Sequence, residues 1–141
     1  MKVEEAIALY HSNHLDDQNI VRIIASLSKG ISFPRFTALT KNLPFSLKEW
    51  ASFLHLTERS LQRYKKDKKT FAPIHAEKIA TIKILFQKGS SVFGDESAFY
   101  TWLNTKSIAL GGELPISFLH SSFGIQLILD ELGRIEHGVL A

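Results

Sequence analysis

No cysteine occurs among the 141 residues of this sequence. Its absence excludes disulfide bonds, thiolate metal sites and cysteine nucleophiles, and it fits a reducing compartment. The first ten residues, MKVEEAIALY, carry acidic side chains where a signal peptide needs an unbroken apolar segment. Elsewhere no apolar run approaches the roughly 18 residues that a membrane-spanning helix needs. We therefore expect a cytosolic protein that does not contact a membrane.

The side-chain combinations of an enzyme active site are also missing. No nucleophile stands beside a general base, and Asp95 and Glu96 are interpreted as acids at a helix start. The stretch LGGE at 110–113 lacks the GxxxxGK[ST] pattern of a phosphate loop and is interpreted as a turn. His11 and His14 lack further ligands at a matching spacing, which favours a surface pair over a zinc site. We expect neither an enzyme nor a bound cofactor.

The composition is that of an ordinary globular protein, with 45% hydrophobic and 22% charged residues. The formal net charge of +3 is unevenly distributed. Residues 1–70 hold 12 Lys or Arg against 7 Asp or Glu, a charge of +5, whereas residues 71–141 hold 5 against 7, a charge of −2. The length allows one domain or two small helical units. A basic first half indicates contact with nucleic acid, and an acidic second half indicates a different partner.

Helical periodicity dominates the sequence, which predicts an all-α fold. Short breaks at glycine and proline separate the segments. Helices are expected at residues 3–10, 16–30, 34–41, 73–89, 95–104 and 122–136, with Asp16 as a cap and with Gly89 ending the fourth of these. Two more short helices are expected between residues 46 and 69.

These two short helices carry the clearest start signals in the sequence. Ser46 and Glu49 have the spacing of a capping box, and Phe45 and Trp50 occupy the positions of a hydrophobic staple. Soon afterwards, Thr57 can cap a second helix. Two capped helices joined by a tight turn predict a helix-turn-helix.

The second of these helices, TERSLQRYKKDKK, has two chemically different faces. Thr57, Leu61 and Tyr64 share one side and predict packing. The opposite side presents Arg and Gln, which can bridge the edges of guanine and adenine in the major groove. The predicted DNA-binding residues are Thr57, Arg59, Ser60, Gln62, Arg63, Lys65 and Lys66, with Lys68 and Lys69 as further phosphate contacts. A lysine-rich helix end is also typical of a solvated face that complements the helix dipole, and this alternative stays open.

Four motifs then follow one another along the chain: LTERSLQRYKKDKKTF, VFGDESAFYTWLN, ALGGELPISFL and LGRIEHGVLA. In this order they resemble the Xre/MbcA/ParS antitoxins of type II toxin-antitoxin systems, over about residues 30–141. The C-terminal motifs are the more specific, namely Trp102-Leu103, residues 109–112 with Pro115, and residues 134–138. One departure is Ala72, which precedes Pro73 where a serine cap is expected. The first 28 residues match no motif.

The resemblance implies an Xre-like helix-turn-helix domain at residues 1–70, packed with a helical toxin-binding domain at 71–141. It implies three partners: operator DNA, a second copy of the chain in a homodimer, and a cognate RES-domain toxin. NAD would be handled by that toxin and not by this chain. The toxin-binding residues that it implies are Trp102, Leu110, Gly111, Gly112, Arg134, Glu136, His137, Gly138, Val139 and Leu140.

The apolar end of the sequence suggests how such a toxin is held. Val139 and Leu140 are interpreted as a plug for the toxin's cleft, with Arg134 and Glu136 as a charged pair that sets register. Trp102, Leu110 and the glycine pair also fit plain packing and turn roles, which would shape the toxin-binding surface without direct contact by all of them. Two other functions remain open: a DNA-binding regulator without a toxin, whose second half dimerises, and an antitoxin whose helix-turn-helix is vestigial.

Overall fold

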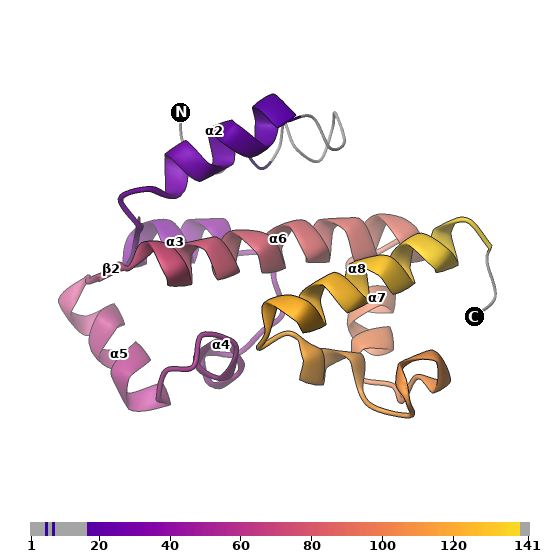
Figure 1. The fold of residues 1–141 in the computed structure, drawn as a ribbon. Coiled ribbons are helices and arrows are strands. Elements are labelled where there is room, and N and C mark those ends of the chain that lie inside the picture. Colours follow the sequence, from indigo (N-terminus) through magenta and orange to yellow (C-terminus); the bar gives the residue numbers. More distant parts are fainter. Residues whose placement is uncertain (1–4, 6, 8–16, 139–141) are drawn as a thin grey trace. The chain divides into compact units, whose positions relative to one another are not determined.

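The structure is a computed structural model that describes residues 5, 7 and 17–138 (Figure 1). The chain forms two compact units, which we call unit 1 (residues 1–84) and unit 2 (residues 85–141). The division falls inside helix α6 (Pro73–Phe93). The sequence predicted a DNA-binding domain that ends at residue 70 and a toxin-binding domain that begins at residue 71. This functional boundary is a separate matter from the structural division and stays a prediction.

Unit 1 is built mainly from helices, as expected. Its elements are α2 (Asp17–Leu27), β1 (Ile31–Ser32), α3 (Phe33–Leu39), α4 (Leu47–Phe53), α5 (Glu58–Asp67), β2 (Thr70–Phe71) and the first part of α6. Most of the helix expected over residues 3–10, and the cap at Asp16, lie outside the described residues.

The all-α expectation needs one correction, because β1 and β2 pair as a small antiparallel sheet. Ile31 lies opposite Phe71, and Ser32 lies opposite Thr70. Gly30 makes this pairing possible, since its φ is +81° and a Cβ at this position would overlap the Phe71 carbonyl. The sheet therefore ties the start of α3 to the segment that follows α5.

The start signals of α4 and α5 are confirmed. The Glu49 N–H donates to Ser46 Oγ at 3.1 Å, and the Ser46 N–H donates to Glu49 Oε1 at 3.0 Å. The rings of Phe45 and Trp50 lie 5.8 Å apart between centroids. The turn that leads to α5 passes through His55 at a φ of +57°, and α4 and α5 follow each other closely in Figure 1. The two short helices and their tight turn are thus as predicted.

An aromatic core holds α5 against the rest of unit 1. Phe71 is fully buried and lies 5.1 Å from Phe36 and 4.9 Å from Tyr64 between ring centroids. Phe36 in turn packs edge-on against Trp50 at 5.3 Å. Tyr64 is the ring that α5 supplies, and its contact with Phe71, together with the fully buried Leu61, places this side of α5 inward.

Unit 2 contains the second part of α6, α7 (Glu96–Leu103), the short 3₁₀ helices η1 (Ile108–Leu110) and η2 (Pro115–Phe118), and α8 (Ser122–Glu136). The expected bounds of the last helix are confirmed, and Asp95 caps α7 by accepting the Ala98 N–H at 2.7 Å. Phe99, Ile128 and Leu132 are fully buried in its core. α6 begins at Pro73 although Ala72 supplies no side-chain cap.

The predicted end of a helix at Gly89 is wrong, because α6 continues through this residue to Phe93. Gly89 is buried, and a Cβ there would overlap the ring of Phe99 from α7. The glycine therefore serves close packing between two helices. A single glycine in a helical pattern can mark either the end of the helix or a site of close packing against another helix, and the sequence alone does not distinguish the two.

Two glycine-to-alanine substitutions should change stability in opposite directions. We expect Gly89→Ala to lower the free energy of unfolding by about 1–3 kcal/mol, because its methyl group must displace the Phe99 ring. Gly133→Ala is the matched control, since Gly133 also lies in a helix and a Cβ there would point into open space. This variant should gain about 0.5–1 kcal/mol from helix propensity. Urea unfolding of both variants measures the difference, and equal effects would contradict the packing role of Gly89.

Candidate functional site

The exposed side of α5 is the first candidate site. We call Arg59, Gln62, Arg63 and Lys66 the α5 face; all four are exposed, whereas Leu61 on the inner side is fully buried. None of the described residues forms an ion pair with Arg59 or Arg63. The two guanidinium groups therefore keep their donors available for an outside acceptor.

The other predicted DNA-binding residues have local roles as well. Thr57 Oγ1 accepts the Ser60 N–H at 3.0 Å and so caps α5, while the hydrogen of the Thr57 hydroxyl is not used in this bond. Lys65 is exposed beside the α5 face. Lys68 ends the helix at a φ of +50°, and Lys69 Nζ lies 5.7 Å from the centroid of the Tyr64 ring. Of the lysines at this end, Lys69 is thus partly engaged by an aromatic ring.

The histidines are the candidate ligands for a metal centre, and two of them, His11 and His14, lie outside the described residues. Among the described residues, no group of three or more His, Asp or Glu side chains is placed to hold a metal ion. Burial, and then the nearby Lys78 and His55, lower the pKa of His75 below its usual value. The folded protein therefore favours an uncharged His75. No described helix combines the length and the apolar character that a membrane span requires.

In unit 2, the structure distributes the predicted toxin-binding residues between core and surface. Trp102 is half-buried and stacks on Phe99 with 5.9 Å between ring centroids, and Leu110 is only 6% exposed. Gly111 and Gly112 are exposed at φ values of +74° and +81°, which confirms the expected turn. Trp102 and Leu110 thus pack mainly inside unit 2, whereas Gly111 and Gly112 lie on its surface.

Arg134 is held by a carboxylate of its own helix. Both Nε and Nη2 of Arg134 contact Oε2 of Glu131, at 2.9 and 2.8 Å. Glu131 is only 6% exposed, and a buried carboxylate needs a compensating charge. The Arg134 guanidinium supplies it. Arg134 and Glu136 thus each pair with another residue of unit 2, and their expected role in setting the register of a toxin stays a prediction.

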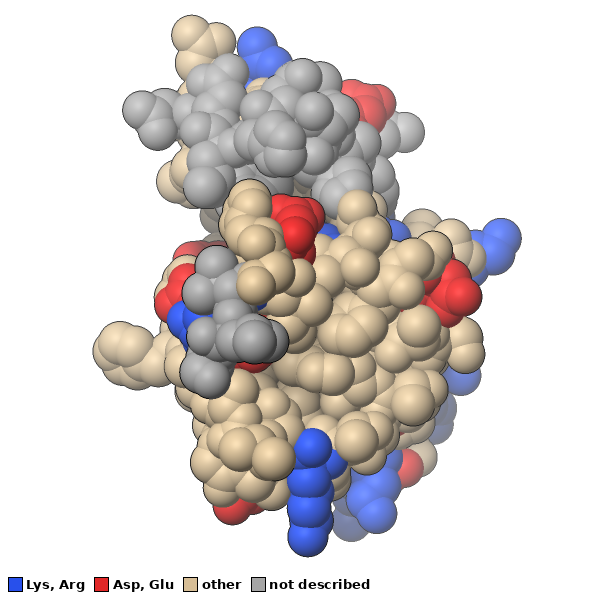
Figure 2. All heavy atoms as spheres, turned by 90° about the vertical axis from the view of Figure 1, so that its right-hand side faces the viewer, with Lys and Arg blue, Asp and Glu red and all other residues tan. Residues whose placement is uncertain are grey.

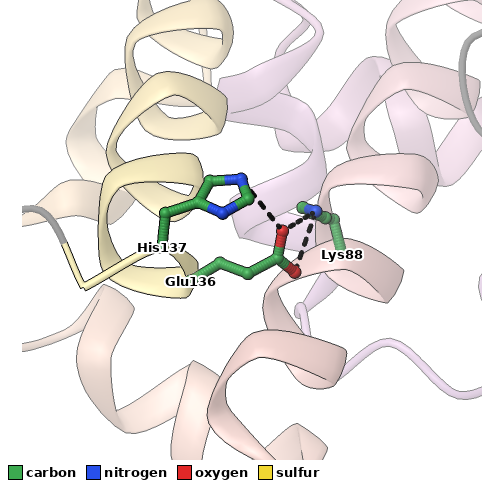
Figure 3. A network of polar contacts seen from close by, with 3 residues as sticks. All are labelled: Lys88, Glu136 and His137. Carbon is green, nitrogen blue, oxygen red and sulfur yellow. Dashed lines mark hydrogen bonds and ion pairs between the residues drawn. The ribbon is translucent and has the colours of Figure 1, made fainter.

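Glu136 pairs with Lys88, which lies on α6 (Figure 3). Lys88 Nζ donates to both carboxylate oxygens, at 2.9 and 3.1 Å, and His137 Nε2 lies 3.8 Å from Oε1. His137 and Gly138 are exposed, and Gly138 has a φ of +70°. The remaining two predicted residues, Val139 and Leu140, lie outside the described residues.

Unit 2 also exposes a set of apolar side chains that the sequence motifs did not predict. Ile108 is 96% and Phe123 is 92% exposed, and Leu114 and Leu127 are also partly exposed. Residues 114–129 contain no Lys, Arg, Asp or Glu. Charged side chains are also sparse over much of the face drawn in Figure 2. Exposed apolar side chains on a charge-poor surface are typical of a protein interface. In the sequence, the feature that could have indicated this surface is the absence of charged residues over 114–129.

Two comparisons with known proteins bear on these surfaces. Residues 88–138 match the family described as the antitoxin Xre/MbcA/ParS C-terminal toxin-binding domain. Over 87 residues the chain is 32% identical to a protein named Antitoxin Xre from Yersinia enterocolitica serotype O:8. This alignment covers 61% of the chain and 59% of the relative, so the chain spans about three fifths of the length of the relative that it matches.

These matches have two consequences for the expectations drawn from the motifs. Both the matched family and the relative are named as antitoxins, which confirms the expectation of a non-enzymatic protein. The matched segment includes Lys88, the glycine turn and the whole of α8. The resemblance seen in the motifs is therefore confirmed over residues 88–138, which match the family of Xre/MbcA/ParS antitoxin C-terminal toxin-binding domains.

Proposed function

We propose that this chain is the antitoxin of a type II toxin-antitoxin system: unit 2 binds and neutralises a RES-domain toxin, and α4 and α5 form a helix-turn-helix that represses the chain's own operon. The observation that carries the proposal is the match of residues 88–138 to a toxin-binding domain. The RES-domain class of the toxin comes from the family resemblance of the motifs.

Three features of unit 2 support the toxin-binding part. Ile108 and Phe123 expose apolar surface that a partner can cover, and both lie inside the matched segment. The glycine pair presents backbone without side chains. Glu136 at the end of α8 and the following His137 are exposed, and only Gly138 separates them from Val139 and Leu140. We propose that the toxin covers the end of α8 and the segment that follows it.

The DNA-binding part rests on the chemistry of α5. A capped helix that follows a tight turn presents Arg59, Gln62 and Arg63 to solvent, and these side-chain types can read guanine and adenine edges. We propose that α5 enters the major groove. Helix-turn-helix proteins commonly bind two half-sites as dimers, so we expect a homodimer on the operator.

Co-expression tests the toxin-binding part directly. The chain and a RES-domain protein encoded next to it would be produced together in cells, with a tag on the chain. We expect the RES-domain protein to co-purify and the cells to grow, whereas the RES-domain protein alone should arrest growth. Growth arrest in both cultures, without co-purification, would contradict the proposal and favour a regulator without a toxin.

The salt dependence of operator binding tests whether the lysines of α5 meet phosphates. Each neutralised phosphate should contribute a slope of about −0.9 to a plot of log affinity against log salt. Lys65→Gln with Lys66→Gln should therefore make the slope shallower by about 1.8 and leave base preference unchanged. Fluorescence anisotropy at several salt concentrations measures this slope. An unchanged slope would show that these lysines form only a solvated helix end.

A further inference from the structure

The ion pair between Lys88 and Glu136 joins two helices that lie far apart in sequence. Lys88 belongs to α6 and Glu136 is the last residue of α8, 48 positions later. Both carboxylate oxygens accept from the same ammonium group, at 2.9 and 3.1 Å. In Figure 3 the two side chains point toward each other from neighbouring helices. The contact therefore ties the final turn of α8 to α6 within unit 2.

Glu136 stands at a position that the local physics of a helix disfavours. The last turn of a helix carries unpaired carbonyl groups, so a negative side chain there meets the negative end of the helix dipole. Lys88 supplies the positive charge that compensates for it. Glu136 is thus unfavourable for α8 itself and is compensated by a residue of another helix. Such an arrangement indicates that Glu136 has a role other than stabilising its own helix.

The pair contributes little to the stability of the fold. The side chains of Lys88 and Glu136 are 31% and 38% exposed, and ion pairs at such positions are weak. α8 is held instead by the buried side chains of Ile125, Ile128 and Leu132. These lie before the last turn, which would fray more easily without Lys88.

The chain changes direction immediately after this contact. The N–H of His137 donates to the Gly133 carbonyl at 3.1 Å, and the N–H of Gly138 donates to the Ile135 carbonyl at 3.1 Å. Gly138 then adopts a left-handed conformation at a φ of +70°. The conformation of His137 and Gly138 thus depends on an intact last turn, which is the turn that Lys88 holds.

We infer that Lys88 and Glu136 are positioning residues for the toxin, which hold His137 and Gly138 at the end of α8 in their observed conformation and do not themselves bind the toxin. The inference rests on the proposed function, in which the toxin covers this helix end. It changes the role of Glu136, which the sequence motifs implied as a contact residue. A partner that binds an already ordered helix end avoids the entropic cost of ordering it.

A charge swap separates positioning from direct contact. The variants are Lys88→Glu, Glu136→Lys and the double variant that carries both, each titrated calorimetrically with the RES-domain protein encoded next to the chain. We expect each single variant to bind at least about tenfold more weakly, and the double variant to recover to within about threefold of wild type. The matched control is Lys106→Glu, an exposed lysine of unit 2 outside this pair, which should leave affinity within about twofold.

Amide hydrogen exchange of the unbound chain gives a second readout that needs no toxin. Exchange at His137 and Gly138 should be about tenfold faster in the single variants and slow again in the double variant, while the Leu132 amide stays protected. Lys88→Met and Glu136→Gln serve the same purpose if a charge reversal prevents folding, and they should also speed exchange, by a smaller factor than the reversals.

The possible results are distinct. Weak binding by the double variant, with exchange restored, would show that Glu136 contacts the toxin and would overturn the inference. Single variants that bind and exchange as wild type would overturn it as well. A wild-type chain that does not bind the RES-domain protein would instead contradict the proposed function. In that case, the exchange rates alone decide whether Lys88 holds the end of α8.

Discussion

Replacing Arg59 and Arg63 together by alanine should nearly abolish specific operator binding and leave toxin binding unchanged. Each arginine that reads a base edge is worth about 1–3 kcal/mol, so the pair corresponds to a loss between roughly 30-fold and more than 10,000-fold. Both side chains are exposed, and none of the described residues pairs with them, so their removal breaks no ion pair of the fold. Electrophoretic mobility shifts with the chain's own promoter measure the effect.

The matched control removes the same number of charges elsewhere on unit 1. Arg22 on α2 and Arg35 on α3 are also exposed, and their double alanine variant should lose less than about fivefold, through general electrostatics alone. Equal losses in the two double variants would show that net charge, and not the α5 face, accounts for binding. Wild-type binding by the Arg59 and Arg63 variant would refute the assignment of α5 to DNA.

Local signals in the sequence were sufficient to locate most helices. The capping box at Ser46 and Glu49, the cap at Thr57 and the apolar stripe of α8 each involve residues only three or four positions apart. Interactions at this spacing are determined by neighbouring residues, so they are visible without any knowledge of the fold.

Contacts between distant segments could not be predicted in the same way. The pairing of β1 with β2, the packing of Gly89 on Phe99 and the ion pair of Lys88 with Glu136 each join elements that a single sequence does not relate. The same limit applied to the candidate site. The motifs selected Glu136 and Arg134 by type, but their partners Lys88 and Glu131 emerged only from the folded chain.

Substitution of Val139 and Leu140 by aspartate should abolish toxin neutralisation while the chain stays folded. Apolar side chains that fill a partner's cleft are often worth about 2 kcal/mol or more each, and an unpaired carboxylate in such a cleft adds a desolvation cost. We therefore expect at least about 30-fold weaker binding. The core side chains Phe99, Ile128 and Leu132 are untouched by this change, so the melting temperature should stay within a few degrees.

Substitution tests the plug more cleanly than truncation does. Removing residues 133–141 would also remove Arg134 and leave the buried Glu131 carboxylate without its guanidinium partner, so folding and toxin binding would fail together. Ile74→Asp is the matched control, because it places a carboxylate on a side chain of unit 1 that is 74% exposed, and it should neutralise the toxin as wild type does. Melting, operator binding and toxin co-purification would be measured on each variant. A double aspartate variant that still protects cells from the toxin would rule out the plug, and one that melts early and loses both activities would show that these side chains pack on their own unit.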